Sequence, residues 1–231
     1  YHVYWVWRDT PDCSTNHDLS YMKSPDLKTW YNAYDEKIKM PATIEDKSLI
    51  VDPIPVQGGI INLAAKLVLD EDNNPVFVYH KFGPEGNTQF FTARLQGKKW
   101  IYNQITDWDY RWYFSGNGSI NSEIRLKDFK KRDDGFYEVG YWHIKYGNGT
   151  LLLNKDFERV GKVLKPEPFN AQLEVEGDFP GLQVQTRGDL GEAENENIRY
   201  ILKWETLDRN RDDPRPKPWP EPSQLYLYKL K

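Results

Sequence analysis

Cysteine is nearly absent from this sequence, and membrane-length apolar runs and an excess of positive charge are missing altogether. One cysteine, Cys13, occurs in 231 residues, so no internal disulfide framework can form. No run of about 18 apolar residues occurs, which removes a membrane-spanning helix. The formal net charge of −4 at pH 7 gives no electrostatic support for nucleic-acid binding. We therefore expect neither a membrane nor a nucleic acid as partner.

The spacings that usually hold metal ions are also missing. The four histidines form no His-x-His pair, and no Cys-x-x-Cys occurs. The stretch Asp70-Glu71-Asp72-Asn73 superficially resembles a calcium loop, but it lacks the glycine and terminal glutamate of an EF-hand. A hairpin turn explains it better. We expect no required cofactor and name no metal ligand, and a structural Ca²⁺ ion has no support in the sequence.

Aromatic residues are abundant, with nine Trp and fifteen Tyr, and 16 Gly and 15 Pro are spread along the chain as turn punctuation. Residues 60–106 give the clearest unit, because four stretches with strand character are separated by short polar turns. These stretches are 60–70, 74–82, 89–95 and 99–106. They predict a four-stranded antiparallel meander of about 50 residues, the size of one propeller blade.

The same template recurs along the chain, with second strands near Trp7, Tyr79, His143 and Trp204, roughly 60 to 70 residues apart. We therefore predict an all-β fold, a β-propeller of four-stranded antiparallel blades, present here as a partial propeller of about three to four blades. The predicted blades are residues 1–45, 58–106, 117–165 and 181–231. A Greek-key sandwich and a closed four-bladed propeller are the alternatives. The chain begins inside a strand, which favours the partial propeller.

Ser24-Pro25-Asp26-Leu27-Lys28-Thr29-Trp30 resembles the Asp-box turn of sialidase-type propellers, without its usual glycine. In such a turn the aspartate caps its own backbone and the tryptophan packs between blades. The motif is typical of a propeller and carries no chemistry.

Four segments together resemble the BNR-repeat polysaccharide lyases, the ulvan lyases in particular. They are WVWRDTPDCSTNHDLSYMKSPDLKTW, IVDPIPVQGGIIN, PVFVYHKFGPEGNTQFFTARL and ITDWDYRWYFSGNGSI. The resemblance covers nearly all of residues 1–165 and weakens after Pro166. It implies a seven-bladed propeller of roughly twice this length, of which this chain looks like the C-terminal half.

The resemblance also implies an activity. Such lyases cleave a sulfated rhamnose–uronate polymer by β-elimination, and their catalytic His, Tyr and Arg lie mainly in the N-terminal blades. We accordingly expect a secreted or periplasmic polysaccharide lyase that acts as a monomer on an anionic polysaccharide.

Strand direction predicts which polar residues gather. In a meander blade the end of the second strand and the start of the first emerge on one face, where propellers bind ligands. The residues that follow second strands are Arg8, Asn16, His17, His80, Lys81, His143 and Lys145. Those that precede first strands include Gly58, Gly59, Asn62, Arg111, Gly116, Asn117 and Ser119.

β-Elimination from a uronate needs a cation to neutralise the carboxylate, a base for the C5 proton and an acid for the leaving oxygen. The catalytic candidates are His80, His17, Arg111 and Tyr79. The substrate-binding candidates are Arg8, Asn16, Asn62, Lys81, Asn117, His143 and Lys145. We predict that Arg111 and His80 point into one cleft on the face that carries His17. The alternative is structural, with His80 bonded to a neighbouring blade, His17 in a turn and Arg111 stacked between blades.

Two other functions remain open, a non-catalytic carbohydrate-binding propeller and a sialidase-like glycoside hydrolase, since a fold does not fix a function. A sialidase would need three arginines and a Tyr–Glu pair. Only Arg8 and Arg111 occupy suitable positions, and no such pair is evident.

Overall fold

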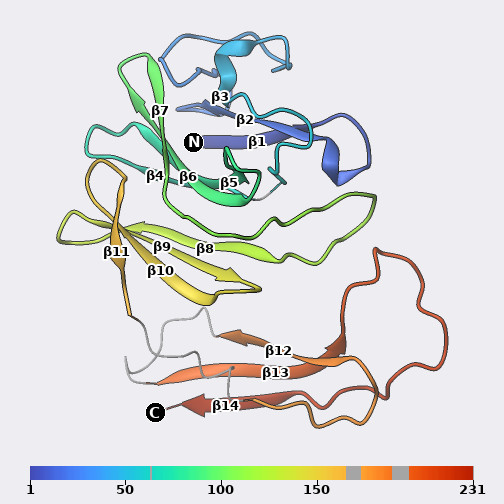
Figure 1. Ribbon diagram of the computed structural model, residues 1–231. Helices are drawn as coiled ribbons and strands as arrows, with labels where there is room; N and C mark the ends of the chain where they lie inside the picture. Colours follow the sequence, from blue (N-terminus) through green and yellow to red (C-terminus); the bar gives the residue numbers. More distant parts are fainter. Residues whose placement is uncertain (63, 165–172, 189–197, 231) are drawn as a thin grey trace. The chain divides into compact units, whose positions relative to one another are not determined.

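The computed structural model describes residues 1–62, 64–164, 173–188 and 198–230 (Figure 1). The chain divides into two compact units. The first unit comprises residues 1–117 and 122–165, and the second comprises 118–121 and 166–231. The described residues form antiparallel sheets of three or four strands and contain no α-helix, so the predicted all-β class is confirmed. None of them forms a helix that could cross a membrane.

The first sheet has three strands in the order β1 (His2–Arg8), β2 (Asn16–Lys23) and β3 (Ile50–Asp52). Two short 3₁₀ helices, η1 (Cys13–Thr15) and η2 (Lys47–Leu49), precede β2 and β3. Each helix begins after an aspartate whose side chain accepts a backbone N–H, which is the usual N-cap contact.

The second sheet is the predicted four-stranded meander. Its strands are β4 (Lys66–Leu69), β5 (Pro75–Phe82), β6 (Thr88–Gln96) and β7 (Lys99–Gln104), paired in sequence order. The first strand is shorter than the expected 60–70. Residues before it form a turn, in which Ala64 donates to the Ile61 carbonyl oxygen, and the Gly58 carbonyl accepts from the end of β5.

The third sheet is also a meander in sequence order. It consists of β8 (Ile124–Lys131), β9 (Tyr137–His143), β10 (Gly147–Leu153) and β11 (Arg159–Lys162). The first strand starts later than the expected Ser119, because Ser119 and its neighbours donate hydrogen bonds within the second unit instead.

The second unit contains a three-stranded sheet of β12 (Leu182–Gly188), β13 (Arg199–Leu207) and β14 (Tyr226–Leu230), with β13 in the centre. The last strand begins at Tyr226 and not at the expected Ser223, whose hydroxyl accepts the N–H of Glu205. The region before β14, rich in proline and arginine, is irregular.

Successive sheets of the first unit pack face against face. Phe77 of β5 contacts Tyr4 and Tyr21 of the first sheet, with both ring-centroid distances at 5.6 Å. Phe90 of β6 similarly faces Tyr141 of β9 at 6.2 Å. Burying a phenylalanine contributes about 1.5–3 kcal/mol, and edge-to-face ring pairs add to it. The core of this unit therefore lies between its sheets.

The Asp-box stretch forms the predicted capped turn. The Asp26 carboxylate accepts the backbone N–H groups of Lys28 and Thr29, both at 2.8 Å. Leu27, in the same turn, has φ 62°, a left-handed conformation that costs about 1–2 kcal/mol in a non-glycine residue.

Candidate functional site

The loop between β5 and β6 forms one wall of a cleft in the first unit. Gly83 donates to the Asn87 carbonyl oxygen at 2.8 Å, and Gly86 donates to the Gly83 carbonyl oxygen at 2.9 Å. Gly86 has φ +83°, which a side chain would strain. The turn chemistry of the sequence GPEGN therefore has a direct structural counterpart.

The opposite wall is the segment that follows β7. This segment lies beside the start of β6, because the nitrogen and the oxygen of the Gln89 side-chain amide both form hydrogen bonds with it. Gln89 Nε2 donates to the Trp108 carbonyl oxygen at 2.7 Å, and Gln89 Oε1 accepts from Thr106 Oγ1 and the Trp108 N–H. A buried amide with each atom paired fixes its neighbours firmly.

The two walls enclose a cleft of about 340 Å³, within the range of small-ligand sites. It is lined by Gly83, Pro84, Glu85, Asn87, Gln89, Gln104, Asp107, Trp108 and Asp109. Trp108 supplies an aromatic wall, and the amides and carboxylates supply hydrogen-bonding groups.

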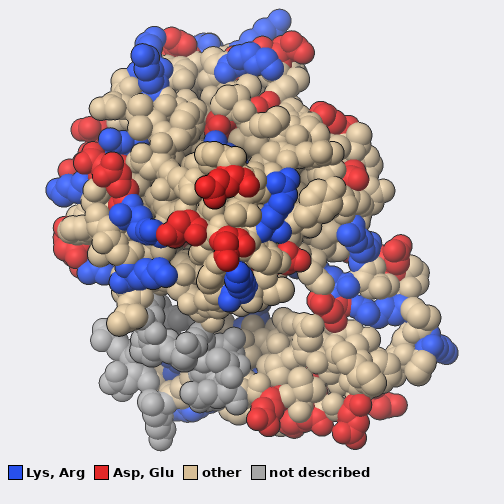
Figure 2. Space-filling model, viewed as in Figure 1, with Lys and Arg blue, Asp and Glu red and all other residues tan. Residues whose placement is uncertain are grey.

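Two cations neutralise the acidic residues of the cleft. Lys145 Nζ lies 2.7 Å from Asp109 Oδ1, and Arg159 Nη1 lies 2.9 Å from Asp107 Oδ1. These contacts lower the pKa of both carboxyl groups, so both stay ionised near neutral pH. On the face in Figure 2, positive and negative side chains are likewise intermixed across the first unit. The cleft therefore has little net charge of either sign.

Arg111 borders this cleft. Its Nη1 donates to the carbonyl oxygen of Gly86 at 2.6 Å, and its guanidinium carbon lies 3.8 Å from the centre of the Phe82 ring. The residue is exposed. Stacking on a ring orients the guanidinium plane while leaving N–H groups available to an incoming carboxylate.

His80 lies near Arg111 but does not face an open cleft. It is 2 % exposed, its Nδ1 donates to the Gly59 carbonyl oxygen at 2.8 Å, and its ring contacts Trp112 at 5.4 Å. Burial lowers its pKa to about 4. The expectation that His80 and Arg111 point into the same cleft is therefore wrong. The ring is enclosed because the glycines before β4 let the backbone cover the end of β5.

Tyr79 and Lys81 both contact Asp52, a residue that was not among the candidates predicted from the sequence. The Asp52 carboxylate, at the end of β3, accepts the Tyr79 hydroxyl and the Lys81 ammonium, both at 2.5 Å. Tyr79 is fully buried, and burial followed by the negative charge of Asp52 raises its pKa well above the ordinary value. This tyrosine lacks access to substrate. The signal in the sequence was the acidic residue inside IVDPIPVQGGIIN.

The ammonium of Lys81 also lies 4.7 Å from the centre of the Phe91 ring. Its side chain is 20 % exposed. The Lys81 ammonium therefore already contacts Asp52 of the first sheet and the Phe91 ring of the second. A substrate would have to compete with these contacts.

The candidates of the first sheet lie around its β1–β2 connection. His17 lies between two carboxylates, with Nδ1 3.0 Å from Asp18 and Nε2 3.1 Å from Asp9. Asn16 is buried and donates to the Cys13 carbonyl oxygen. Arg8 donates to backbone carbonyls of its own loop. The alternative interpretation of this loop, a self-stabilised turn, accounts for these contacts.

His143 and Lys145 lie in the β9–β10 hairpin. His143 is fully buried among Trp108, Tyr110 and Tyr146, and its Nδ1 accepts the N–H of Lys145 at 3.0 Å. Burial, with a smaller effect of the Lys145 charge, lowers the pKa of His143 to about 4. The histidine is therefore enclosed in this hairpin and bonded to the backbone of Lys145, whose ammonium lies at the cleft.

Asn62 and Asn117 are exposed, and neither is among the described residues that line the cleft. Across the described parts of the chain, no three His, Cys, Asp or Glu side chains are grouped to hold a metal ion. The acidic Asp70 loop is a hairpin turn, in which the Asp70 carboxylate accepts the N–H groups of Asp72 and Asn74.

Residues 1–108 match the family described as BNR repeat-containing family member. The matched region carries β1 to β7 and ends at Trp108, inside the cleft. This part of the chain is similar to the BNR-repeat family, whose repeats are found in sialidases and other carbohydrate-active enzymes. No curated protein matched the chain.

Proposed function

We propose that this chain belongs to a polysaccharide-degrading protein, and that the cleft of the first unit holds part of an anionic sugar chain. One observation carries the proposal. The Arg111 guanidinium is exposed, stacked on Phe82 and bonded to Gly86, whose neighbours Glu85 and Asn87 line the cleft. A planar, oriented guanidinium suits the carboxylate of a uronate.

The successive face-to-face sheets of the first unit support a propeller arrangement in which each sheet is one blade. In such a fold, ligands bind where loops from neighbouring blades meet. The cleft fits this description, since its walls come from the β5–β6 loop and from the segment that leads to the third sheet.

For the activity we propose β-elimination, which the resemblance to ulvan lyases implies. A base removes the C5 proton of the uronate, the electron pair forms the C4–C5 double bond, and the C4–O bond breaks with protonation of the leaving oxygen. Arg111 would neutralise the carboxylate and so make the C5 proton more acidic. His80 and Tyr79 are enclosed, so the proton-transfer groups would come from other blades, where the resemblance places them.

A non-catalytic carbohydrate-binding propeller is the second candidate. The observation that favours it is the burial of His80 and Tyr79, each committed to a structural hydrogen bond. A sialidase-like hydrolase has less support, since no arginine triad surrounds the described cleft residues.

Incubation of the full-length protein with a uronate polymer tests the proposal, with the ultraviolet absorbance of unsaturated uronate as the readout. Arg111→Ala is expected to lower kcat/KM by about 10²- to 10³-fold. Arg125→Ala is the matched control, because this exposed arginine also lies over a ring, that of Trp142, at 5.2 Å. Binding by the wild type without new absorbance would favour the non-catalytic function. Equal losses in both variants would contradict the role of Arg111.

A further inference from the structure

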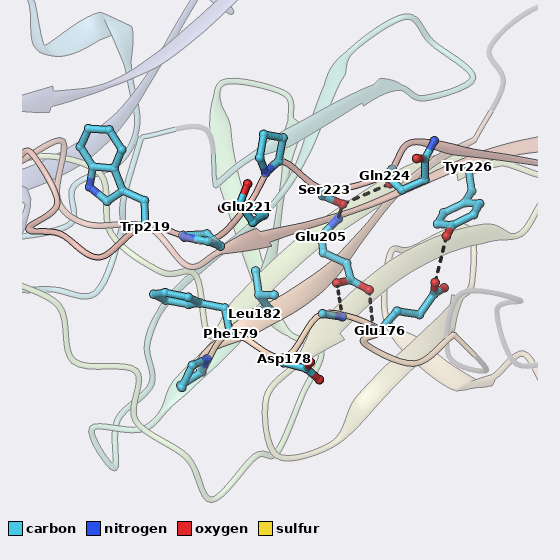
Figure 3. A pocket seen from close by; sticks show the side chains of 14 residues that line it. Glu176, Asp178, Phe179, Leu182, Glu205, Trp219, Glu221, Ser223, Gln224 and Tyr226 are labelled. Atoms are coloured by element: carbon cyan, nitrogen blue, oxygen red, sulfur yellow. Dashed lines mark hydrogen bonds between the residues drawn. The ribbon is translucent and has the colours of Figure 1, made fainter.

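A second and larger concavity lies within the second unit, outside the region that matches the BNR family. It has a volume of about 610 Å³, which suits a ligand of several rings. Figure 3 shows it between two chain segments, residues 176–182 and residues 219–226, with Glu205 of β13 between them. We call it the β13 groove.

Aromatic rings and prolines make up much of the wall of the β13 groove. Trp219 is 61 % exposed, and Phe179 and Tyr226 also line the groove. The Trp219 indole N–H donates to the Arg215 carbonyl oxygen at 3.1 Å, which restricts the ring. An exposed, restricted indole presents a flat apolar face at low entropic cost, which suits stacking against a ring.

The polar part of the wall is acidic. Glu176, Asp178, Glu205 and Glu221 line the groove, whereas no Lys or Arg is among the described residues that do so. The buried Lys203 ammonium contacts Glu176 and lies 3.4 Å from Glu205, which also accepts two backbone N–H groups. The carboxylates of Asp178 and Glu221 make no described contact with a cation. A second ammonium, that of Lys217, lies 5.3 Å from the centre of the Trp219 ring. Four carboxylates and two ammonium groups leave the groove with net negative charge.

We propose that the β13 groove is a second saccharide site, and that it takes neutral or amino sugars and excludes uronate and sulfated ones. The aromatic faces would stack against sugar rings, and the carboxylates and the Gln224 amide would accept hydrogen bonds from hydroxyl or ammonium groups. Because carboxylates outnumber the nearby ammonium groups, a carboxylate or sulfate would face mainly like charges. This selectivity is opposite to that of the cleft beside Arg111.

The proposal goes beyond the proposed function, because it concerns a different unit and a different class of sugar. A basic peptide is the other occupant that negative charge would attract. The exposed Trp219 ring, with hydrogen-bond acceptors beside it in the wall, favours a sugar chain, and a peptide becomes one outcome of the test.

Isothermal titration calorimetry of the full chain tests it with four probes, namely a neutral xylo-oligosaccharide, a chitosan oligosaccharide, an oligouronate and a lysine-rich peptide. The first or second is expected to bind, and Trp219→Ala is expected to weaken that binding by about tenfold, the loss of one stacking contact. Trp219→Phe should retain most of the affinity. Tyr113→Ala is the matched control, since Tyr113 is an aromatic residue 64 % exposed in the first unit.

The double variant Asp178→Asn/Glu221→Gln tests the charge argument separately, because it removes two negative charges and preserves hydrogen bonding. It should raise the affinity for the oligouronate and lower that for the chitosan oligosaccharide. The proposal is overturned if Trp219→Ala leaves binding of the neutral and amino probes unchanged, or if a lysine-rich peptide alone binds.

These measurements test the cleft beside Arg111 and the β13 groove separately. Arg111→Ala should leave binding of the neutral and amino probes intact, and Trp219→Ala should leave lyase activity on a short oligouronate intact. A protein without lyase activity that still binds neutral sugars through Trp219 would refute the proposed function and support the β13 groove.

Discussion

Strands β5 and β13 both lie inside their sheets, and each buries a nitrogen base, His80 or Lys203, in a different way. His80 of β5 is 2 % exposed and bonds to a backbone carbonyl oxygen, and burial lowers its pKa to about 4. Lys203 of β13 is 1 % exposed, and hydrogen bonds from it to Glu176 and Glu205 raise its pKa. One strand therefore buries a neutral group, and the other buries a charge.

The surroundings of the two strands explain the difference. Residues 75–80 of β5 are all buried, because neighbouring sheets cover both of its faces. A cation there would lose its hydration without a partner, so the histidine stays neutral. In β13 only Lys203 is buried, and the Glu176 carboxylate that it contacts remains exposed to water. A shallow site with acidic neighbours keeps the ammonium charged.

The largest expected loss of stability concerns Lys81, a charged side chain of β5 that has a carboxylate partner. Asp52→Ala removes the partner of this ammonium and of the Tyr79 hydroxyl, and should lower the free energy of unfolding by about 3–5 kcal/mol. Chemical denaturation measures it. Asp156→Ala is the control, since this exposed carboxylate pairs with Arg94 and should change stability by less than about 1 kcal/mol. Equal effects would show that Asp52 is not a buried partner.

The next effect concerns the packing of His80. His80→Ala removes the contact with Trp112 and the hydrogen bond to Gly59, and should cost about 2–4 kcal/mol in the same denaturation experiment. His80→Asn retains a donor at this position and should cost less. A stability unchanged by His80→Ala would contradict the enclosed position of this ring.

The free energy of unfolding should also depend on pH through the buried histidines. His80 and His143 have pKa values lowered from 6.5 to about 4, so the unfolded chain binds more protons than the folded one between these values. Their contribution to stability is complete above pH 6.5 and is lost as the pH falls toward 4. Each buried histidine adds a slope of up to roughly 1.4 kcal/mol per pH unit in that window.

The variant His80→Asn/His143→Asn isolates this effect, because asparagine has similar hydrogen-bonding groups and does not titrate. Denaturation midpoints of the variant should vary less between pH 6.5 and 4 than those of the wild type. An unchanged slope would mean that other groups, such as the carboxylates, control acid unfolding.

The smallest expected effect is that of Lys203→Met. Because the Glu176 carboxylate that Lys203 contacts is 56 % exposed, the loss of this ion pair should lower the melting temperature of the second unit by less than Asp52→Ala lowers that of the first unit. The raised pKa of Lys203 also predicts that its contribution is present below its unfolded pKa and disappears in alkaline solution. Calorimetry at neutral and at alkaline pH measures the contribution of Lys203 when its ammonium is charged and when it is neutral. Lys217→Met is the control, because the Lys217 ammonium also lies over an aromatic ring, that of Trp219.

Local patterns in the sequence predicted much of the fold. Alternation and turn residues located the meander of β4 to β7, and the Asp-box stretch predicted its own capped turn. The strand limits at residues 60 and 119 could not be predicted, because distant hydrogen bonds decide them. The Gly58 carbonyl bonds to Phe82, and the Ser119 N–H bonds to Asp212.

The all-β class, the hairpin turns and the position of Arg111 beside aromatic residues follow from local periodicity and from neighbouring residues, so the amino-acid sequence was enough to predict them. The accessibility of the polar side chains depends on the folded structure. Tyr79 and Lys81 are two residues apart on one strand and share Asp52 from another sheet, yet one is fully buried and the other is not. Burial depends on what packs from elsewhere in the chain, and one strand's sequence cannot specify that.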